Sequence, residues 1–314
     1  SINSDPTQPD IIELLKQAFI DMDREIVHDA LHLFVDEPET VRPILFPAIT
    51  GSCAVVALID ETTKELYVAH CGDSRAILGA HDSPWAWKGI QLTSDHNAAI
   101  ELERVRLSRD HQDGMSVVVG DRVLGLLAVT RAFGDASFKW HRHLVQAIYP
   151  GLFPDKKCPD PMASISPPYI TARPDVMRLK LRPQDRFLVL ASDGLFEGLS
   201  NELVAELMGG FFEQIVSNGG DPDDKFNFIM DDPTFTPTEE RRLYLDAGLE
   251  HGLRKGAPIY QEGQENEQRI NAATLLIENT FNIISKGATP SLLALKAPDS
   301  SNYRDDVTVA VIFF

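Results

Sequence analysis

Three aspartate motifs lie where apolar runs typical of buried strands begin or end. Asp73 ends "LYVAHCGD", Asp193 ends "RFLVLASD", and Asp305 begins "DDVTVAVIFF". A carboxylate that is buried along with such a strand is unfavourable unless it is paired with a cation or binds a metal. Hard cations such as Mg²⁺ and Mn²⁺ prefer oxygen ligands, so carboxylates that converge from several strands predict a site for them. Two such cations can bind phosphate oxygens and activate a water for attack on phosphorus.

Each of these aspartates also has a purely structural interpretation. Asp73 in "GDSR" and Asp193 in "SDG" stand in stretches typical of turns, and a turn needs no metal. Asp305 or Asp306 would be satisfied by an ion pair with Arg304. The metal hypothesis therefore depends on whether the strands bring the three motifs to one place.

The strands that would position these aspartates are recognisable by pattern. Residues 54–60, 66–73 and 75–80 are apolar segments joined by tight polar turns, which predicts an antiparallel meander. Two more strands surround a turn at Pro183, and residues 305–314 predict a final strand.

Helical spacing of apolar or polar side chains marks four further segments. They are residues 9–34, 97–110, 201–218 and 266–284. Asp10 is the candidate N-cap of the first, and Gly209-Gly210 is a predicted weak point in the third. Because strands occur in clusters between helices, antiparallel sheets with helices packed outside are favoured over a β-α-β alternation.

The composition narrows the classes of partner. The 314 residues are 43% hydrophobic and carry 47 acidic against 29 basic side chains, a formal net charge of −18. That balance argues against nucleic acid and anionic membranes as main partners, but not against phosphorylated proteins. No apolar run approaches the ~20 residues that span a bilayer. The three cysteines have no C-x-x-C spacing, which suits a reducing compartment.

Six motifs, in their order along the chain, resemble the signatures of the metal-dependent protein serine/threonine phosphatases of the PP2C type. They are "TGSCAVVALID", "LYVAHCGDSRAIL", "LTSDHN", "RVLGLLAVTRAFGD", "LVLASDGLFE" and "YRDDVTVAVI". Stretches such as "SPPYITARPDV" and "INAATLLIENTF" are similar, more narrowly, to the mitochondrial pyruvate dehydrogenase phosphatase branch. The resemblance covers nearly the whole chain.

The resemblance implies a centre that holds two Mn²⁺ or Mg²⁺ ions. Asp193 and Asp305 match ligands of that centre, and Asp73 matches a residue that helps to hold a further, weaker metal. Gly194 and Asp306 match supporting residues, and at the position of Asp306 the family often has Asn.

Three other residues are expected to serve the scaffold. Asp135 in "FGD" matches a family motif and is expected to anchor loops near the cleft. Cys53 in "GSC" stands where "GST" is usual, and we expect a small packed thiol that is not a nucleophile. His96 in "TSDHN" is expected to order the neighbouring helix.

The implied fold is of the α+β class. It is a PP2C-like α/β/β/α sandwich of two antiparallel sheets flanked by helices, with the metals in a cleft at one end. We expect residues 1–314 to form a single phosphatase domain that lacks N-terminal strands, with a variable surface insertion at about 218–264.

Part of the family's site has no match in this sequence. Upstream of the first helix, family members carry a phosphate-binding Arg, an acidic pair and an Asp-Gly-His motif whose His protonates the leaving group. None of these occurs in residues 1–50, and Asp113-Gly114 is followed by Met115 in the wrong segment. No catalytic residue is therefore identified. The resemblance implies that the chain, which starts "SINSDPTQPD", is the larger C-terminal part of a phosphatase.

The implied function is Mn²⁺- or Mg²⁺-dependent dephosphorylation of phosphoserine and phosphothreonine in proteins by a water that the metal activates. The branch points to the E1 component of pyruvate dehydrogenase as substrate and to the mitochondrial matrix, with the cytoplasm as the other compartment. The alternative is an inactive fragment or pseudophosphatase that binds a phosphoprotein. The missing motif favours this alternative, and the retained aspartates count against it.

Two other phosphate chemistries fit less well. Asp21 and Asp23 in "DMDRE" offer a D-x-D pair for aspartyl phosphotransfer, but they fall in a helical pattern, and we interpret both as a solvated helix face. Cys71 and Arg75 in "HCGDSRA" lack the spacing and the glycines of a cysteine-phosphatase loop.

Overall fold

The computed structural model describes most of the chain outside one long acidic segment. The described residues are 10–29, 31, 42–83, 86–111, 117–152, 166–217, 271–284 and 305–314. They divide into two compact units, each considered by itself: unit 1 is Ser1–Ser74 with Thr93–Lys180, and unit 2 is Arg75–Leu92 with Leu181–Phe314. The insertion predicted at about 218–264 lies outside the described residues. The single domain over 1–314 stays a prediction.

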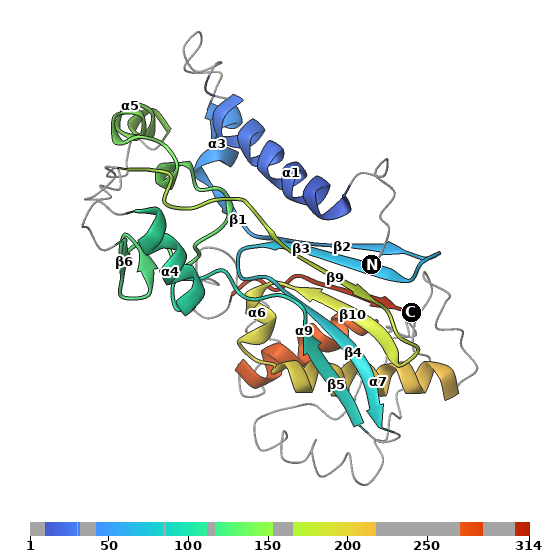
Figure 1. Ribbon diagram of the computed structural model, residues 1–314. Coiled ribbons are helices and arrows are strands. Elements are labelled where there is room, and N and C mark those ends of the chain that lie inside the picture. The colour runs from blue at the N-terminus through green and yellow to red at the C-terminus, as the bar shows by residue number, and fades with distance from the viewer. Residues whose placement is uncertain are drawn as a thin grey trace. The chain divides into compact units, whose positions relative to one another are not determined.

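Unit 1 is built on a three-stranded antiparallel sheet (Figure 1). Its strands, in spatial order, are β2 (Ala54–Asp60), β3 (Glu65–Cys71) and β9 (Asp175–Lys180). β2 and β3 form a hairpin in which Ala54 pairs with Cys71 and Asp60 with Glu65. Lys64 adopts a φ of 58° in the turn. This hairpin confirms the strands predicted at 54–60 and 66–73.

Helix α1 (Ile11–Arg24) packs its apolar face on this sheet. Asp10 caps the helix as predicted, since its Oδ1 accepts a hydrogen bond from the Ile12 N–H at 3.0 Å. Phe19 is buried with Cys71 of β3, and its ring centroid lies 5.2 Å from that of Phe133. The helix continues into a π-helical turn, η1 (Glu25–Asp29).

The other described helices and strands of unit 1 are all shorter than α1. They are α3 (Arg42–Ile49), β1 (Gly51–Ser52), α4 (Glu101–Asp110), β6 (Val118–Val119), β7 (Arg122–Val123), β8 (Phe133–Gly134), η2 (Ala136–Phe138) and α5 (Arg142–Leu152). β1 pairs with β8, and β6 pairs with β7. α3 and α5 share an apolar cluster in which Leu45, Trp140 and Ile148 are buried.

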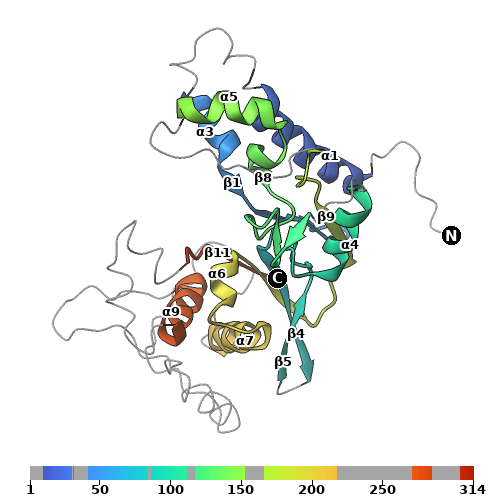
Figure 2. The same ribbon diagram turned by 90° about the vertical axis from the view of Figure 1, so that its left-hand side faces the viewer.

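Unit 2 is built on a four-stranded antiparallel sheet. Its strands, in spatial order, are β11 (Val309–Phe313), β10 (Asp185–Ala191), β4 (Arg75–Ser83) and β5 (Ala86–Gln91). Its helices are α6 (Asp193–Phe196), α7 (Asn201–Ser217) and α9 (Ala272–Ile284). Figure 2 shows α7 and α9 side by side. Phe187, Leu188 and Val189 of the central strand β10 are fully buried.

The predicted strand partners are wrong in one respect. The predicted meander joins residues 75–80 to 66–73, but β4 instead hydrogen-bonds with β5 and β10. β9 and β10, on either side of Pro183, also belong to different sheets. The apolar pattern indicates that a segment is a strand, but it carries no information about which strand lies beside it.

Helix α7 runs without interruption through the predicted weak point at Gly209-Gly210. A Cβ at Gly209 would lie 2.2 Å from Cγ of Trp87, so the glycine makes room for the indole ring. One turn further along α7, Glu213 Oε1 accepts a hydrogen bond from Trp87 Nε1 at 2.8 Å. The glycine therefore serves the packing of β5 on α7.

Both units contain an antiparallel sheet with helices packed against it, which confirms the predicted α+β class. Among the residues that the structure describes, no helix combines the length and the apolar character needed to cross a bilayer.

Candidate functional site

Asp193 stands where the central strand of unit 2 gives way to a helix. β10 ends at Ala191, Ser192 is extended at φ −69° and ψ 163°, and Asp193 is the first residue of α6. Because the chain turns here, Asp193 lies outside the apolar layer and is exposed to solvent. A carboxylate at the end of this dry strand therefore keeps contact with water.

Asp305 and Asp306 lie directly beside this turn. β11 runs antiparallel to β10 with Val309 opposite Ala191, so the start of one strand meets the end of the other. Ser192 extends the pairing: its N–H donates to Thr308 O at 3.0 Å, and its Oγ donates to Asp306 O at 3.1 Å. The structure thus brings the Asp193 and Asp305 segments together.

Gly194 sets how closely these two segments approach. A Cβ on this buried glycine would lie 2.6 Å from the Asp306 carbonyl oxygen and 3.2 Å from Cβ of Asp305. No real Cβ approaches a backbone oxygen so closely, so only glycine permits this packing. Gly194 therefore has a physical reason to accompany the two aspartates.

The carboxylates fit a hard divalent cation in kind. Asp193 and Asp305 are both exposed, and their carboxylate oxygens are of the kind that coordinates such a cation. Asp305 Oδ1 also accepts a hydrogen bond from the Asp306 N–H at 2.7 Å. Mg²⁺ keeps several waters and often takes only one or two protein carboxylates. Among the described residues, no group of three or more His, Cys, Asp or Glu side chains is arranged to hold a metal. The pair could supply part of the shell of one cation, and both this role and the two-metal centre stay predictions.

Asp73 belongs to unit 1, just after β3. It is half-buried, and its Oδ1 accepts a hydrogen bond from Cys53 Sγ at 3.3 Å. A Cβ at Gly72, which has a φ of 107°, would lie 2.2 Å from the Cys53 sulfur. The thiol is thus packed against the backbone beside Asp73. That Asp73 joins Asp193 and Asp305 stays a prediction.

Cys71 is unsuited to act as a nucleophile. It is fully buried on β3, and burial raises the pKa of its thiol to about 12. A thiolate at neutral pH is what cysteine-dependent phosphate chemistry requires. Arg75, for its part, donates to Asn201 Oδ1 at 2.9 Å within unit 2. Both observations agree with the rejection of a cysteine-phosphatase loop.

Asp135 links the paired strands β1 and β8. Its backbone is left-handed, with a φ of 47°, and its N–H donates to Thr50 O at 3.3 Å. A Cβ at Gly51 would lie 2.1 Å from Asp135 Oδ2, so the carboxylate rests on bare backbone. Burial raises its pKa to about 6. The side chain therefore sits in the scaffold of unit 1.

Asp23 is not part of a solvated helix face, and the prediction for it is wrong. Its Oδ1 lies 2.6 Å from Lys139 Nζ and also accepts the Gly134 N–H at 2.9 Å. The Asp23 side chain is only 14% exposed and the Lys139 side chain only 5%. Asp23 follows the buried Phe19 by four positions, so helical periodicity alone places it on the inner face. That spacing was the available signal.

A buried ionic cluster centred on Glu103 was missed by sequence reasoning. Glu103 of α4 is 4% exposed and accepts hydrogen bonds from Arg131, Arg106 and Thr130. Burial alone would raise its pKa, but these donors outweigh burial and lower the pKa to about 2. Arg131 also reaches Asp175 Oδ1 at 2.8 Å. The cluster therefore ties α4 to the first residue of β9.

Two stacked imidazoles complete this cluster. His96 is 1% exposed, its Nε2 lies 3.0 Å from Asp175 Oδ2, and its Nδ1 is 3.3 Å from the Gly72 N–H. The His70 ring stacks on it with centroids 4.1 Å apart, and His70 Nε2 lies 2.8 Å from Ser94 O. These contacts agree with the structural role predicted for His96, and they hold the backbone next to Asp73.

His70 makes stability depend on pH. Burial and the neighbouring His96 lower its pKa to about 4 from 6.5, despite the opposing effect of Asp175. As the pH falls, His70 is protonated in the unfolded chain before it is protonated in the folded one. The free energy of unfolding should therefore be highest above pH 6.5 and should decrease by about 3 kcal/mol as the pH falls towards 4. Urea unfolding across this range measures the decline. His70→Gln should show a shallower decline by one proton, and identical slopes would contradict the assignment.

Comparison with known proteins identifies the family. The protein phosphatase 2C family matches residues 9–221. The chain belongs to this family. The match within this PP2C chain includes Asp73, Asp135 and Asp193 but ends before Asp305. Asp305 is therefore connected to the candidate site by its packing against Gly194.

Curated relatives of this PP2C chain cover almost all of it. A protein phosphatase 2C homolog of Schizosaccharomyces pombe is 31% identical over 316 residues, which is 99% of this chain and 64% of the relative. Human mitochondrial [pyruvate dehydrogenase [acetyl-transferring]]-phosphatase 1 is 33% identical over 327 residues, or 98% and 56%. The chain thus spans between about half and two thirds of these relatives.

Solved structures are more distant. The serine-threonine phosphatase 2C of Toxoplasma gondii is 21% identical, with a TM-score of 0.42 over 70% of this chain and 63% of that one.

Proposed function

We propose that the chain is part of a Mn²⁺- or Mg²⁺-dependent phosphatase that removes phosphate from phosphoserine and phosphothreonine in proteins. The observation that supports it is the contact between the Asp193 and Asp305 segments, held by Ser192 and Gly194, in a PP2C chain. Exposed carboxylates at one point of a rigid sheet are what a phosphate-handling cation requires.

In this proposal the residues of unit 2 hold the cation. Asp193 and Asp305 would be its ligands, and a bound divalent cation supplies a water of lowered pKa and offsets the charge of phosphate oxygens. Ser192 fixes the Asp306 backbone, so the two ligands keep their separation. Asp306, Gly194 and Asp135 remain supporting residues, and Asp73 is proposed to help hold a further, weaker cation.

We further propose a substrate and a compartment. Several relatives are named as mitochondrial phosphatases of pyruvate dehydrogenase. These names support the phosphorylated E1 component of pyruvate dehydrogenase as substrate and the mitochondrial matrix as compartment. The net charge of −18 suits a protein substrate better than nucleic acid.

Hydrolysis of p-nitrophenyl phosphate by the 314-residue chain tests this function. The p-nitrophenolate anion leaves without a proton, so the reaction does not need the family's general acid. We expect turnover that requires Mn²⁺ and that falls at least about 100-fold in Asp193→Asn. A phosphoserine peptide should react about 10²–10⁴-fold more slowly, because its alkoxide must be protonated.

Glu197→Gln is the matched control, because Glu197 is an exposed carboxylate in the same short segment. It should keep full turnover. A folded chain that binds Mn²⁺ but hydrolyses no p-nitrophenyl phosphate would contradict the proposal and favour a phosphoprotein-binding pseudophosphatase.

A further inference from the structure

Helix α6 carries Asp193 but is too short to be stable by itself. It runs for only four residues, Asp193–Phe196, and the first turn of a helix fixes several residues for a single hydrogen bond, which is unfavourable in water. Its orientation therefore depends on packing. Figure 1 shows α6 at the end of β10, and in Figure 2 it lies next to α9. The contacts that fix α6 also fix where the Asp193 carboxylate lies.

The two central residues of α6 are held by the core of unit 2. Leu195 is fully buried, and its carbonyl oxygen accepts a hydrogen bond from Thr280 Oγ1 of α9 at 3.4 Å. Gly194 packs against the Asp306 backbone. Phe196, at the C-terminal end of the helix, is half-buried and needs a restraint of its own.

Arg75 contacts this C-terminal end. It is the first residue of β4 and pairs with Ala191, the last residue of β10, so it stands beside the turn that leads into α6. Its Cζ lies over the Phe196 ring, 4.4 Å from the centroid. That is well within the ~6 Å at which a guanidinium is attracted to an aromatic face. The guanidinium therefore covers the ring at the end of α6.

Two side-chain amides anchor the guanidinium. Arg75 Nη1 donates to Asn201 Oδ1 at 2.9 Å, and Asn201 Nδ2 donates in turn to Gln91 Oε1 at 2.8 Å. Asn201 is the first residue of α7 and Gln91 the last residue of β5, two elements of unit 2 that pack on each other. Arg75 is thus tied to a packed part of the unit while it contacts Phe196.

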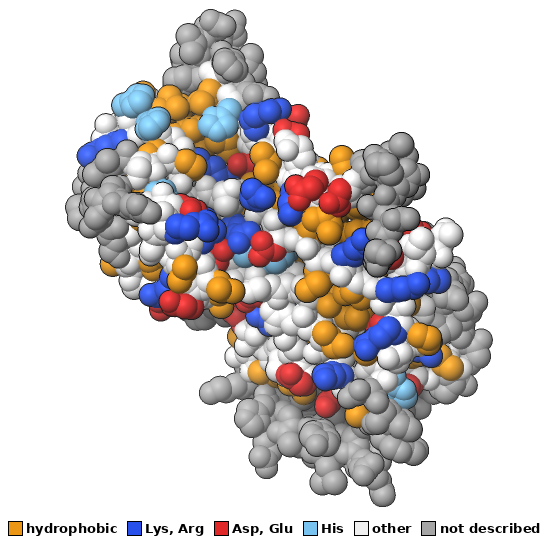
Figure 3. Space-filling view, viewed as in Figure 1, with side chains coloured by type: hydrophobic (Ala, Val, Ile, Leu, Met, Phe, Trp, Pro, Cys, Tyr) orange, Lys and Arg blue, Asp and Glu red, His pale blue; other side chains and the backbone are white. Residues whose placement is uncertain are grey.

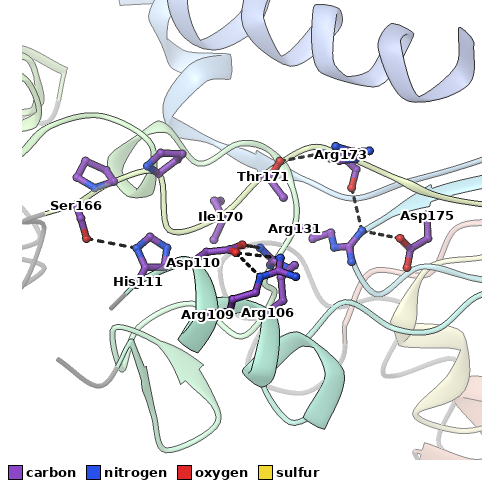
Figure 4. A pocket seen from close by; sticks show the side chains of 12 residues that line it. Arg106, Arg109, Asp110, His111, Arg131, Ser166, Ile170, Thr171, Arg173 and Asp175 are labelled. Atoms are coloured by element: carbon purple, nitrogen blue, oxygen red, sulfur yellow. Dashed lines mark hydrogen bonds and ion pairs between the residues drawn. The ribbon is translucent and has the colours of Figure 1, made fainter. Parts of the chain in front are cut away.

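Several other arginines of the chain are paired with carboxylates. Basic and acidic side chains are interspersed on the face shown in Figure 3. At the cavity of unit 1 drawn in Figure 4, Arg131 Nη1 lies 2.8 Å from Asp175 Oδ1. The amide and the ring that Arg75 contacts are neutral, so these two contacts depend on the planar fork of the guanidinium as well as on its charge. Lysine has no such fork and should replace Arg75 only in part.

We propose that Arg75 is a positioning residue for Asp193. Through the ring of Phe196 it holds α6 in place, so that Asp193 stays beside the Asp305 segment. In this role Arg75 contacts neither cation nor substrate. The function of Asp193 as a cation ligand rests on the proposed phosphatase, whereas the restraint on α6 does not.

Hydrogen exchange of the full chain in EDTA tests the restraint without any metal. The Glu197 N–H donates to Asp193 O at 3.2 Å and the Leu199 N–H to Leu195 O at 3.1 Å, so exchange of these amides reports the opening of α6. We expect Arg75→Met to speed their exchange about fivefold to tenfold. Exchange at the buried Val189 of β10 should change far less, which excludes global unfolding as the cause.

Phe196→Leu removes the other partner of the same contact. It should speed exchange in α6 as Arg75→Met does, and the double variant should exchange little faster than either single variant, because both changes remove one interaction. Fully additive effects would mean that the two side chains act independently, and the proposal would be wrong.

Titration calorimetry with Mn²⁺ tests the consequence for Asp193. Arg75→Met should weaken Mn²⁺ binding about tenfold, as when a residue that orients a metal ligand is removed, and Arg75→Lys should fall between this variant and the unaltered chain. Arg186→Met is the matched control. Arg186 Cζ lies 5.9 Å from the Phe212 ring centroid, near the opposite end of β10, so its loss should leave both α6 exchange and Mn²⁺ affinity unchanged.

The two measurements separate a failure of this proposal from a failure of the proposed function. If the unaltered chain and Arg75→Met bind Mn²⁺ equally well, Arg75 does not position Asp193, although the cation site stands. If the unaltered chain binds no Mn²⁺, the proposed function fails, and faster exchange in Arg75→Met would still support the restraint on α6. Unchanged exchange in Arg75→Met overturns that restraint.

Discussion

Glu103→Gln is expected to lower the free energy of unfolding by about 3–5 kcal/mol, because it removes the charge that balances a buried guanidinium. Glu103 Oε1 lies 2.6 Å from Arg131 Nη2, and the two side chains are 5% and 11% exposed, respectively. Water cannot replace the lost partner at such burial. Urea unfolding at neutral pH measures the loss, and the midpoint should fall without a change of slope.

Glu101→Gln provides the control for this substitution. Glu101 is an exposed carboxylate in the first turn of the same helix, α4, and its loss should change stability by no more than about 0.5 kcal/mol. Glu103→Gln combined with Arg131→Gln should cost less than the sum of the single changes, because the two side chains share one interaction. Equal effects of Glu101→Gln and Glu103→Gln would contradict the cluster's importance.

Gly194→Ala is expected to destabilise the chain by about 1–3 kcal/mol, since the added methyl group meets backbone that cannot move aside. The nearest atom is the Asp306 carbonyl oxygen, 2.6 Å from the position of the new Cβ. Relief of this contact would separate the Asp193 and Asp305 segments. Mn²⁺ affinity should therefore fall about tenfold, as when residues that orient metal ligands are changed.

Gly151→Ala is the control for Gly194→Ala. Gly151 lies in α5, and a Cβ built there meets no atom within 4 Å. Alanine is the better helix former, so this variant should be slightly more stable than the original. Calorimetric Mn²⁺ titration of both variants gives the comparison. Unaltered Mn²⁺ affinity in Gly194→Ala would show that the two segments need not lie so close.

Local elements were readable from the sequence because their signals are local. The hairpin of β2 and β3, the Asp10 cap and strand β10 follow from alternation, capping chemistry and apolar runs. The contact between the segments that carry Asp193 and Asp305 is a more demanding case. Each motif shows an aspartate at a strand end, but the contact exists only because β10 and β11 pair antiparallel.

The contacts that the sequence did not predict join residues that are far apart along the chain. Asp23 and Lys139 are 116 residues apart, and Glu103 and Arg131 are 28 apart. No short window contains both partners, so a buried carboxylate reads as an ordinary surface one. Asp23 differs from Glu103 in that it follows the buried Phe19 by four helical positions, a spacing that already indicated burial. The placement of β4 beside β10 is non-local in the same way.

Mn²⁺-linked unfolding of the chain and of Asp305→Asn tests the central claim, that Asp193 and Asp305 together hold a divalent cation. A ligand that binds only the folded state stabilises it by about 2.7 kcal/mol at 100 times its dissociation constant. We expect Mn²⁺ to stabilise the original chain and Glu197→Gln in this way, and to leave Asp305→Asn nearly unchanged. Equal stabilisation of all three proteins would mean that Mn²⁺ binds nonspecifically to a chain of net charge −18, and the claim would be wrong.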